Sequence, residues 1–284
     1  MIVSVLTPGA SLLPWSTTIP GALLINWLPG QEMGNGFADV VFGTVNPSAR
    51  LSVTFPNIDN EMQFTESQYP GVNFPPEASY TEGLFVGYRW YDGHVDTTSS
   101  DSTSDSTSDS NELVATKPNY PFGYGLSYTQ FEYSNMQVTY IADITSDIST
   151  STSSSNTPNT PTSSVTDTLV SVSIDVSNIG QYAGDEIIQL YLQYPTSAQE
   201  PLHQLRGFQK KYFKNFQNHQ NNKNIDFDIT DTTETIEFNL TRRDMSIWDI
   251  ELHNWVLVST LTDPYIIHIG SSSRNIYMNT TINF

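Results

Sequence analysis

The chain has 284 residues, 37% of them hydrophobic, and a formal net charge of −19 from 11 basic and 30 acidic residues. This excess of acidic residues argues against nucleic acids and anionic membranes as partners, because both need clustered Lys and Arg side chains. Cysteine is absent, which excludes disulfides, thiol catalysis and cysteine-based zinc sites. The length allows one large domain or two ordinary ones.

The N-terminal part of the chain alternates short apolar runs with turns. Ile2–Leu6, Ala22–Leu28 and Leu51–Phe55 are predicted strands, and Gln31–Phe42 carries apolar residues at helical spacing. Gly43 follows that helix, at a position where a left-handed backbone conformation favours glycine. A strand, a helix and a strand with short connections predict an α/β layout.

The opening segment does not have the pattern of a signal peptide. It has no basic residue before Arg50, and Pro8 and Gly9 interrupt its apolar run. No apolar run reaches the length of a membrane-spanning helix. A chain that opens within a predicted strand indicates further polypeptide upstream. Two glycosylation sequons, at Asn239 and Asn279, permit a secretory route.

The middle of the chain mixes aromatic segments with polar tracts. Residues 80–94 are rich in Tyr and Trp, whereas residues 97–110 repeat an Asp-Ser-Thr-Ser unit that does not bury a core. We therefore predict a disordered insert at 97–116. A second Ser/Thr-rich tract follows at 146–164, and an expanded hairpin loop is predicted at 215–224.

From Leu169 onward the apolar pattern is typical of β-strands. Apolar and polar residues alternate, turn residues separate the runs, and no helical segment intervenes. The predicted strands cover residues 169–178, 185–195, 235–240, 255–259, 265–271 and 276–284. Strands at this regular spacing predict a β-sandwich.

A glycine-rich turn precedes the predicted helix. Gly34 and Gly36 match the first two glycines of a dinucleotide-binding fingerprint, but Asp39 stands where the third glycine is needed. A carboxylate at a helix N-terminus repels a pyrophosphate. We therefore predict only a flexible start to the helix, and we expect no cofactor.

Glu32 and Asp39 are the acidic residues best placed for chemistry in this stretch. Either carboxyl is able to act as an acid or a base. However, Glu32 lies where the helix dipole favours a negative charge, by about 0.3–1 kcal/mol. Asp39 has two structural alternatives, which are to face solvent or to pair with Arg50. A structural role is favoured for both residues.

Glu82, Arg89 and Asp92 lie in the aromatic segment and leave two interpretations open. Carboxylates and arginine beside aromatic rings are typical of sugar recognition, because rings stack on apolar sugar faces while charged groups bind hydroxyls. The same composition also fills an interface between domains, with Arg89 paired internally. The residue types alone do not decide between these two functions.

The remaining candidate side chains indicate no metal site and no nucleophilic triad. His203, His219, His253 and His268 show no ligand spacing and are predicted to be structural or solvated. No Ser/His/Asp order or nucleophile elbow is present. The stretch "RRDMSIWD" (242–249) is predicted to form a turn with a Trp anchored in the core.

Several stretches resemble a known family, glycoside hydrolase family 3, which contains β-glucosidases and β-xylosidases. "LPWSTTIPGALLINWLPGQEMGNGFADVVFGTVNPSARLSVTFP" (13–56) resembles part of the α/β sandwich domain of that family. "YTEGLFVGYRWYD" (80–92) and "PFGYGLSYTQFEYS" (121–134) match two further motifs in the same order. The stretches at 170–195, 205–213, 242–249 and 267–276 resemble its C-terminal fibronectin type III-like domain.

This resemblance implies a domain division. Residues 1–134 correspond to the C-terminal part of the α/β sandwich domain, with the insert at 97–116. Residues 135–168 contain a strand leading into the next domain and the Ser/Thr-rich insert. Residues 169–284 correspond to the fibronectin type III-like sandwich. The expected fold is therefore a partial α/β sandwich followed by an all-β sandwich.

The resemblance also implies a retaining glycosidase mechanism that this chain does not complete. In the family, an Asp on an N-terminal barrel attacks the anomeric carbon and a Glu of the second domain protonates the leaving oxygen. No residue here corresponds to either one, so no catalytic, substrate-binding or metal-binding residue is assigned. The match gives Glu32 and Asp39 a structural place. Full-length relatives are expected to be secreted or lysosomal/vacuolar.

The residues and the resemblance together leave three hypotheses for the function of this chain. The first is the C-terminal part of a β-glucosidase-type hydrolase, inactive alone, whose complete enzyme acts on β-linked oligosaccharides or glucosides. The second is a non-catalytic module that binds a glycan or a partner through residues 80–92 and the sandwich. The third is a scaffold that completes an enzyme with a barrel supplied in trans, because missing strands leave an apolar edge exposed.

Overall fold

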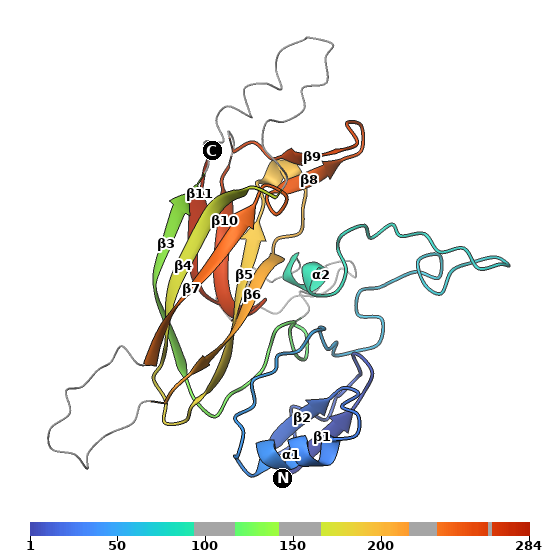
Figure 1. Ribbon diagram of the computed structural model, residues 1–284. Helices are drawn as coiled ribbons and strands as arrows, with labels where there is room; N and C mark the ends of the chain where they lie inside the picture. Colours follow the sequence, from blue (N-terminus) through green and yellow to red (C-terminus); the bar gives the residue numbers. More distant parts are fainter. Residues whose placement is uncertain (94–116, 142–165, 216–231, 261–262) are drawn as a thin grey trace, which may run out of the picture.

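The computed structural model describes residues 1–93, 117–141, 166–215, 232–260 and 263–284. The predicted inserts at 97–116 and 146–164 lie outside these residues, as does all but the first residue of the loop predicted at 215–224. The described chain is mostly β-sheet with few helices (Figure 1). Within it, no helix is long and apolar enough to cross a membrane.

The N-terminal part consists of a parallel strand pair and a short helix. β1 (Ile2–Leu6) pairs in parallel with β2 (Ala22–Asn26), and α1 (Met33–Val41) follows. The predicted strand at Ala22–Leu28 and the predicted helix at Gln31–Phe42 are confirmed with shorter bounds. Helical spacing of apolar residues therefore identified α1 correctly.

The segment after α1 differs in part from its prediction. Gly43 has a φ of +77°, as expected for a glycine that ends a helix. The strand predicted at Leu51–Phe55 is wrong. Leu51 N donates to Tyr124 O at 2.9 Å, and Phe55 forms only an isolated bridge with Tyr120. A continuous ladder does not form there, so this extended run stays outside the sheets.

The later strands form two antiparallel sheets, which overlap in the view of Figure 1. One sheet has the order β11-β10-β5-β6 and the other has the order β3-β4-β7. The bounds are β3 Phe131–Tyr140, β4 Thr168–Asn178, β5 Gly184–Gln193, β6 Gln204–Phe213, β7 Thr233–Thr241, β10 Tyr265–Ser272 and β11 Asn275–Ile282. Two such sheets are compatible with the predicted β-sandwich.

The main hydrophobic core lies between these two sheets. Alternate residues of β4, including Val172 and Ile174, are fully buried, and they belong to one cluster with Ile188 of β5 and Ile267 of β10. Each such side chain contributes about 1.5–3 kcal/mol on burial. The alternation of apolar and polar residues thus sets which face of each sheet turns inward.

Four short elements complete the fold. α2 (Tyr88–Gly93) lies beside the sheet that contains β5 and β6, and η2 (Thr196–Ala198) follows β5 (Figure 1). β8 (Ser246–Asp249) and β9 (Asn254–Leu257) form a hairpin that extends away from the two sheets. The position of α2 determines where the polar residues of the aromatic segment meet the sheet.

Candidate functional site

The aromatic segment reaches the sheet through Tyr88 at the start of α2. The Tyr88 hydroxyl accepts a hydrogen bond from Leu205 N at 3.0 Å. Its ring stacks on Phe122, with centroids 4.6 Å apart, and meets the edge of Tyr191 at 6.2 Å. These contacts hold α2 against β5 and β6 and turn its next residues toward the sheet.

Asp92 is the charged residue at the centre of this interface, and it is only 2% exposed. Its Oδ1 accepts hydrogen bonds from Arg274 Nε at 3.0 Å and from Ser273 Oγ at 3.4 Å. Arg274 also donates to the Tyr91 carbonyl. Asp92 therefore pairs with the turn between β10 and β11, about 180 residues later in the chain.

His203 lies on the other side of the same carboxylate. Its Nδ1 is 3.7 Å from Asp92 Oδ2, and both atoms are buried without a hydrogen-bond partner among the described residues. The His203 ring also packs edge-on against His268, with centroids 4.6 Å apart. His268 Nε2 is 3.2 Å from Gln193 Oε1. Burial, together with the neighbouring His203, lowers the pKa of His268 to about 4.

Tyr91 fixes the opposite side of α2 to the loop that precedes it. Its hydroxyl donates to Glu61 Oε2 at 2.7 Å, and that oxygen also accepts from Asn57 N at 3.0 Å. Burial raises the pKa of Tyr91 well above its usual value, and the Glu61 carboxylate adds to the increase. The phenol therefore stays protonated and acts as a hydrogen-bond donor.

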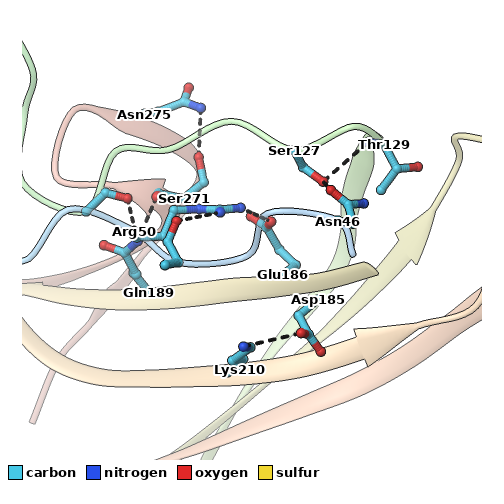
Figure 2. Close-up of polar contacts among 12 residues, drawn as sticks. Asn46, Arg50, Ser127, Thr129, Asp185, Glu186, Gln189, Lys210, Ser271 and Asn275 are labelled. Carbon is cyan, nitrogen blue, oxygen red and sulfur yellow. Dashed lines mark hydrogen bonds and ion pairs between the residues drawn. The ribbon is translucent and has the colours of Figure 1, made fainter. Parts of the chain in front are cut away.

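A second polar interface joins the segment after α1 to the same sheet (Figure 2). The Arg50 guanidinium contacts Glu186 Oε2 at 2.5 Å, and Tyr133 Oη donates to Glu186 Oε1 at 3.0 Å. Burial raises the pKa of Glu186, and the Arg50 charge offsets only part of the increase. The charged pair is compensated on both carboxylate oxygens, as a buried ion pair requires.

Amide side chains extend this second interface (Figure 2). Asn46 Nδ2 donates to Ala183 O at 3.0 Å, and its Oδ1 accepts from Ser127 Oγ at 3.0 Å. Gln189 Nε2 donates to the carbonyl of Ser271 at 2.6 Å. Backbone groups of loops far apart in sequence are satisfied in this way, so the interface is an ordered packing contact.

The structure separates the acidic and basic candidates that the sequence offered. Asp39 is exposed, so it faces solvent, and the alternative pairing with Arg50 is wrong because Arg50 binds Glu186. Glu32 accepts from Asn35 Nδ2 at 2.6 Å on the exposed face of α1. Each of these acids therefore makes only local contacts on the surface of the N-terminal part.

The three candidates of the aromatic segment do not share one site. Glu82 accepts a hydrogen bond from Gln68 Nε2 at 3.1 Å. The Arg89 guanidinium lies 5.7 Å from the centroid of the Tyr88 ring, and its Nε has no hydrogen-bond partner in the described part of the chain. Asp92 alone occupies the interface with the sheet, which favours the interface interpretation for that residue.

The described histidines and the stretch at 242–249 differ in burial and contacts. His203 and His268 contact each other, His253 is exposed, and His219 lies outside the described residues. The described residues contain no group of three or more His, Asp or Glu side chains that is able to hold a metal ion. Met245 is buried, but Trp248 is 48% exposed, so the prediction that this Trp is anchored in the core is wrong.

Comparison with known proteins shows which family domain and which proteins this chain resembles. Residues 1–88 match the family described as the glycosyl hydrolase family 3 C-terminal domain. The chain is 32% identical to probable β-glucosidase D of Aspergillus niger over 260 residues, 92% of this chain and 28% of that protein. It is 30% identical to thermostable β-glucosidase B of Acetivibrio thermocellus, over 99% of this chain and 29% of that protein.

Solved structures agree with these relatives. The β-D-glucoside glucohydrolase of Trichoderma reesei superposes with a TM-score of 0.72 and 30% identity, over 99% of this chain and 33% of that one. β-Glucosidase 3B of Thermotoga neapolitana, solved in complex with glucose, superposes with a TM-score of 0.67 and 26% sequence identity. The chain thus spans about a third or less of the relatives it matches. Its first 88 residues match the C-terminal domain of glycoside hydrolase family 3, and the whole chain corresponds to the C-terminal portion of these β-glucosidases.

Proposed function

We propose that this chain provides the C-terminal supporting structure of a retaining β-glucosidase-type glycoside hydrolase. The barrel and both catalytic carboxylates then lie on polypeptide outside these 284 residues. In a retaining glycosidase the two carboxyl groups lie roughly 5–5.5 Å apart. The substrate of the complete enzyme would be a β-linked oligosaccharide or glucoside, which the β-glucosidase names of the relatives support.

The observation that carries this proposal is the uncovered N-terminal sheet. Parallel sheets normally have both faces covered. Here the two-stranded sheet of β1 and β2 leaves Ile2 50% exposed and Leu6 54% exposed, and α1 has no buried residue. Phe42, at the end of α1, is 84% exposed. Apolar surface of this kind is what a larger α/β domain would bury.

The domain assignment is part of the same proposal. The sequence predicts the α/β sandwich domain at residues 1–134 and a fibronectin type III-like domain at residues 169–284. β3 pairs with β4 from Phe131 to Tyr140, so we place the boundary before Phe131 and count β3 as the first strand of the second domain. The interfaces around Asp92 and Arg50 would then hold the two domains together.

An activity assay tests the proposal. The chain alone is expected to give no turnover of an aryl β-glucoside. Fused in place of the matching C-terminal part of the Trichoderma reesei relative, it is expected to support turnover. Turnover by the chain alone that disappears in Asp92→Asn or Glu61→Gln would place the reacting carboxyls within this chain and reject the proposal.

A second candidate function is a non-catalytic module that binds a glycan or a protein. Exposed aromatic side chains favour it, with Tyr80 81% exposed and Phe85 37% exposed in the aromatic segment. Calorimetric titration with cello-oligosaccharides tests the glycan form of this function. Heat of binding that is lost on Tyr80→Ala would support the aromatic segment as the binding surface, and its absence at millimolar ligand would reject it.

A further inference from the structure

The β8–β9 hairpin presents two tryptophans outside the hydrophobic core. Trp248 and Trp255 are directly opposite each other in the register of the hairpin. Because side chains alternate across a strand, they lie on the face opposite to Ile247 and Val256. Ile247 packs against the main core, whereas Trp248 remains 48% exposed. The hairpin therefore turns one face toward the core, and on its other face Trp248 is exposed and Trp255 is half-buried.

The two rings are held in a defined geometry. Their centroids are 5.5 Å apart and their planes meet at 68°. The guanidinium carbon of Arg243 lies 4.0 Å from the centroid of the Trp255 ring and covers one face of it. Arg243 is itself exposed. Ring pairs and cation–π contacts of this type fix side chains before any ligand arrives, which lowers the entropic cost of binding.

The loop between the strands is ordered by its own polar groups. Asp249 Oδ1 accepts hydrogen bonds from Glu251 N at 2.8 Å and from Leu252 N at 2.9 Å. His253 has a φ of +50°, in the left-handed region. These contacts are local, so the hairpin keeps its shape beyond the edge of the core. Glu251 in this loop is exposed, as is Arg243 beside the Trp255 ring.

We propose that Trp248, Trp255 and Arg243 form a binding site for a neutral, β-linked glucan chain. Equatorially linked glucose units present flat faces of C–H groups that stack on an indole ring, while their edges carry hydroxyls. Arg243 supplies N–H donors for those hydroxyls, and Glu251 in the exposed loop of the same hairpin offers a carboxylate as an acceptor. The choice of a glucan rests on the proposed role in β-glucoside hydrolysis.

Other ligand classes fit this surface less well. The chain carries a net charge of −19, which disfavours anionic ligands such as nucleic acids. The aromatic face is a pair of rings on a short hairpin rather than a groove, which suits a ribbon-like chain that stacks on single rings. The site lies on β8 and β9, away from the α2 interface around Asp92, and would hold a substrate chain near the enzyme.

Indole NMR of the whole chain tests this site without any catalytic turnover. The chain has 5 Trp residues, so its indole N–H signals are few and are assigned by single Trp→Phe variants. Addition of cellohexaose is expected to shift the Trp248 and Trp255 signals in a saturable manner. Trp248→Ala is expected to weaken binding at least about tenfold, equivalent to about 1.4 kcal/mol.

Two further variants separate binding from hairpin stability. Tyr182→Ala removes another exposed aromatic ring, which is 60% exposed in the original chain, and is expected to leave the affinity for cellohexaose unchanged. Trp248→Tyr keeps a ring in the hairpin and is expected to retain binding within roughly fivefold of the original chain, while Trp248→Ala loses it. Circular dichroism melting of each variant establishes that the sheets remain folded.

Several results would overturn the proposal. The first is an equal affinity for cellohexaose in Trp248→Ala and the original chain. The second is a set of indole N–H shifts confined to other tryptophans. The third is no shift at about 10 mM cellohexaose, a concentration above the dissociation constants usual for weak specific sites. Self-association of the chain that requires Trp248 and ignores cellohexaose would assign the face to a second copy instead. None of these results depends on turnover, so the hydrolase proposal is judged separately by its own assay.

Discussion

Arg50 and Glu186 are 136 residues apart in the sequence, yet their side chains form an ion pair in which each is less than 10% exposed. The guanidinium comes from the segment after α1, and the carboxylate comes from β5 in the sheet below it (Figure 2). Tyr133 of β3 completes the contact by donating to the second carboxylate oxygen. One polar cluster thus joins the N-terminal part to both sheets.

Removal of one partner from this pair is expected to be costly. Arg50→Met leaves the Glu186 carboxylate buried without its counter-charge, so the free energy of unfolding should fall by about 3–5 kcal/mol. The matched control is Lys210→Met, because Lys210 pairs with Asp185 at 3.3 Å with a half-exposed side chain. Urea denaturation should show a loss of at most about 1 kcal/mol for the control. Equal losses in both variants would contradict the assigned role of Arg50.

The Asp92 carboxylate is expected to hold α2 on the sheet. Asp92→Asn removes the charge that Arg274 binds, so α2 should detach more often while the sheets stay folded. Hydrogen exchange of the amides of residues 88–93 should accelerate by about 10- to 100-fold, for a local loss of about 1.4–2.7 kcal/mol. Glu82→Gln is the control, because the Glu82 carboxylate accepts a hydrogen bond from Gln68 and both residues are half-exposed. Unchanged exchange in Asp92→Asn would reject this role.

The stability of the fold is expected to decrease on mild acidification through His268. Its pKa of about 4 in the folded chain lies below the usual value of 6.5, because burial and His203 disfavour the charged ring. The unfolded chain therefore takes up the proton first as pH falls. The stability that neutral His268 adds to the folded chain is fully present above pH 6.5 and is lost between pH 6.5 and 4. It amounts to about 1–2 kcal/mol of unfolding free energy, after allowance for the partial exposure of the ring.

Comparison with a non-titrating variant isolates this effect. In His268→Gln, the difference in unfolding free energy between pH 7 and pH 4.5 should be smaller than in the original chain by that amount. Carboxylates titrate in both proteins, so their effect on the pH dependence of the unfolding free energy cancels in the comparison. Identical pH profiles of the two proteins would show that His268 is not buried in its neutral form.

Glycine substitutions test the packing of the core. A Cβ added at Gly207 would lie 2.8 Å from Phe238 Cδ1, a ring buried between the sheets, so Gly207→Ala should destabilise by about 1–3 kcal/mol. Gly36 lies within α1 with no atom within 4 Å of an added Cβ. Gly36→Ala should therefore stabilise by up to about 1 kcal/mol. Thermal melts that shift in the same direction for both variants would contradict this packing.

The local elements were predictable from the sequence because their signals are local. Apolar residues at helical spacing identified α1, and strict alternation identified β4 with its buried Val172 and Ile174. The left-handed glycine after α1 was also predictable, since only its immediate neighbours set that conformation. β6 has no such alternation, because its exposed middle carries Lys210 and Lys211, and it was not predicted as a strand.

The long-range relationships were decided by the tertiary structure alone. The sequence left Asp39 either exposed or paired with Arg50, and it left two functions open for Asp92. The fold places Asp39 in solvent and pairs Asp92 with Arg274. Leu51–Phe55 has the composition of a strand but finds only a single bridge. The physical reason is that ion pairing, strand pairing and the exposure of Trp248 depend on which distant segment packs alongside. Periodicity within one element carries no information about that partner.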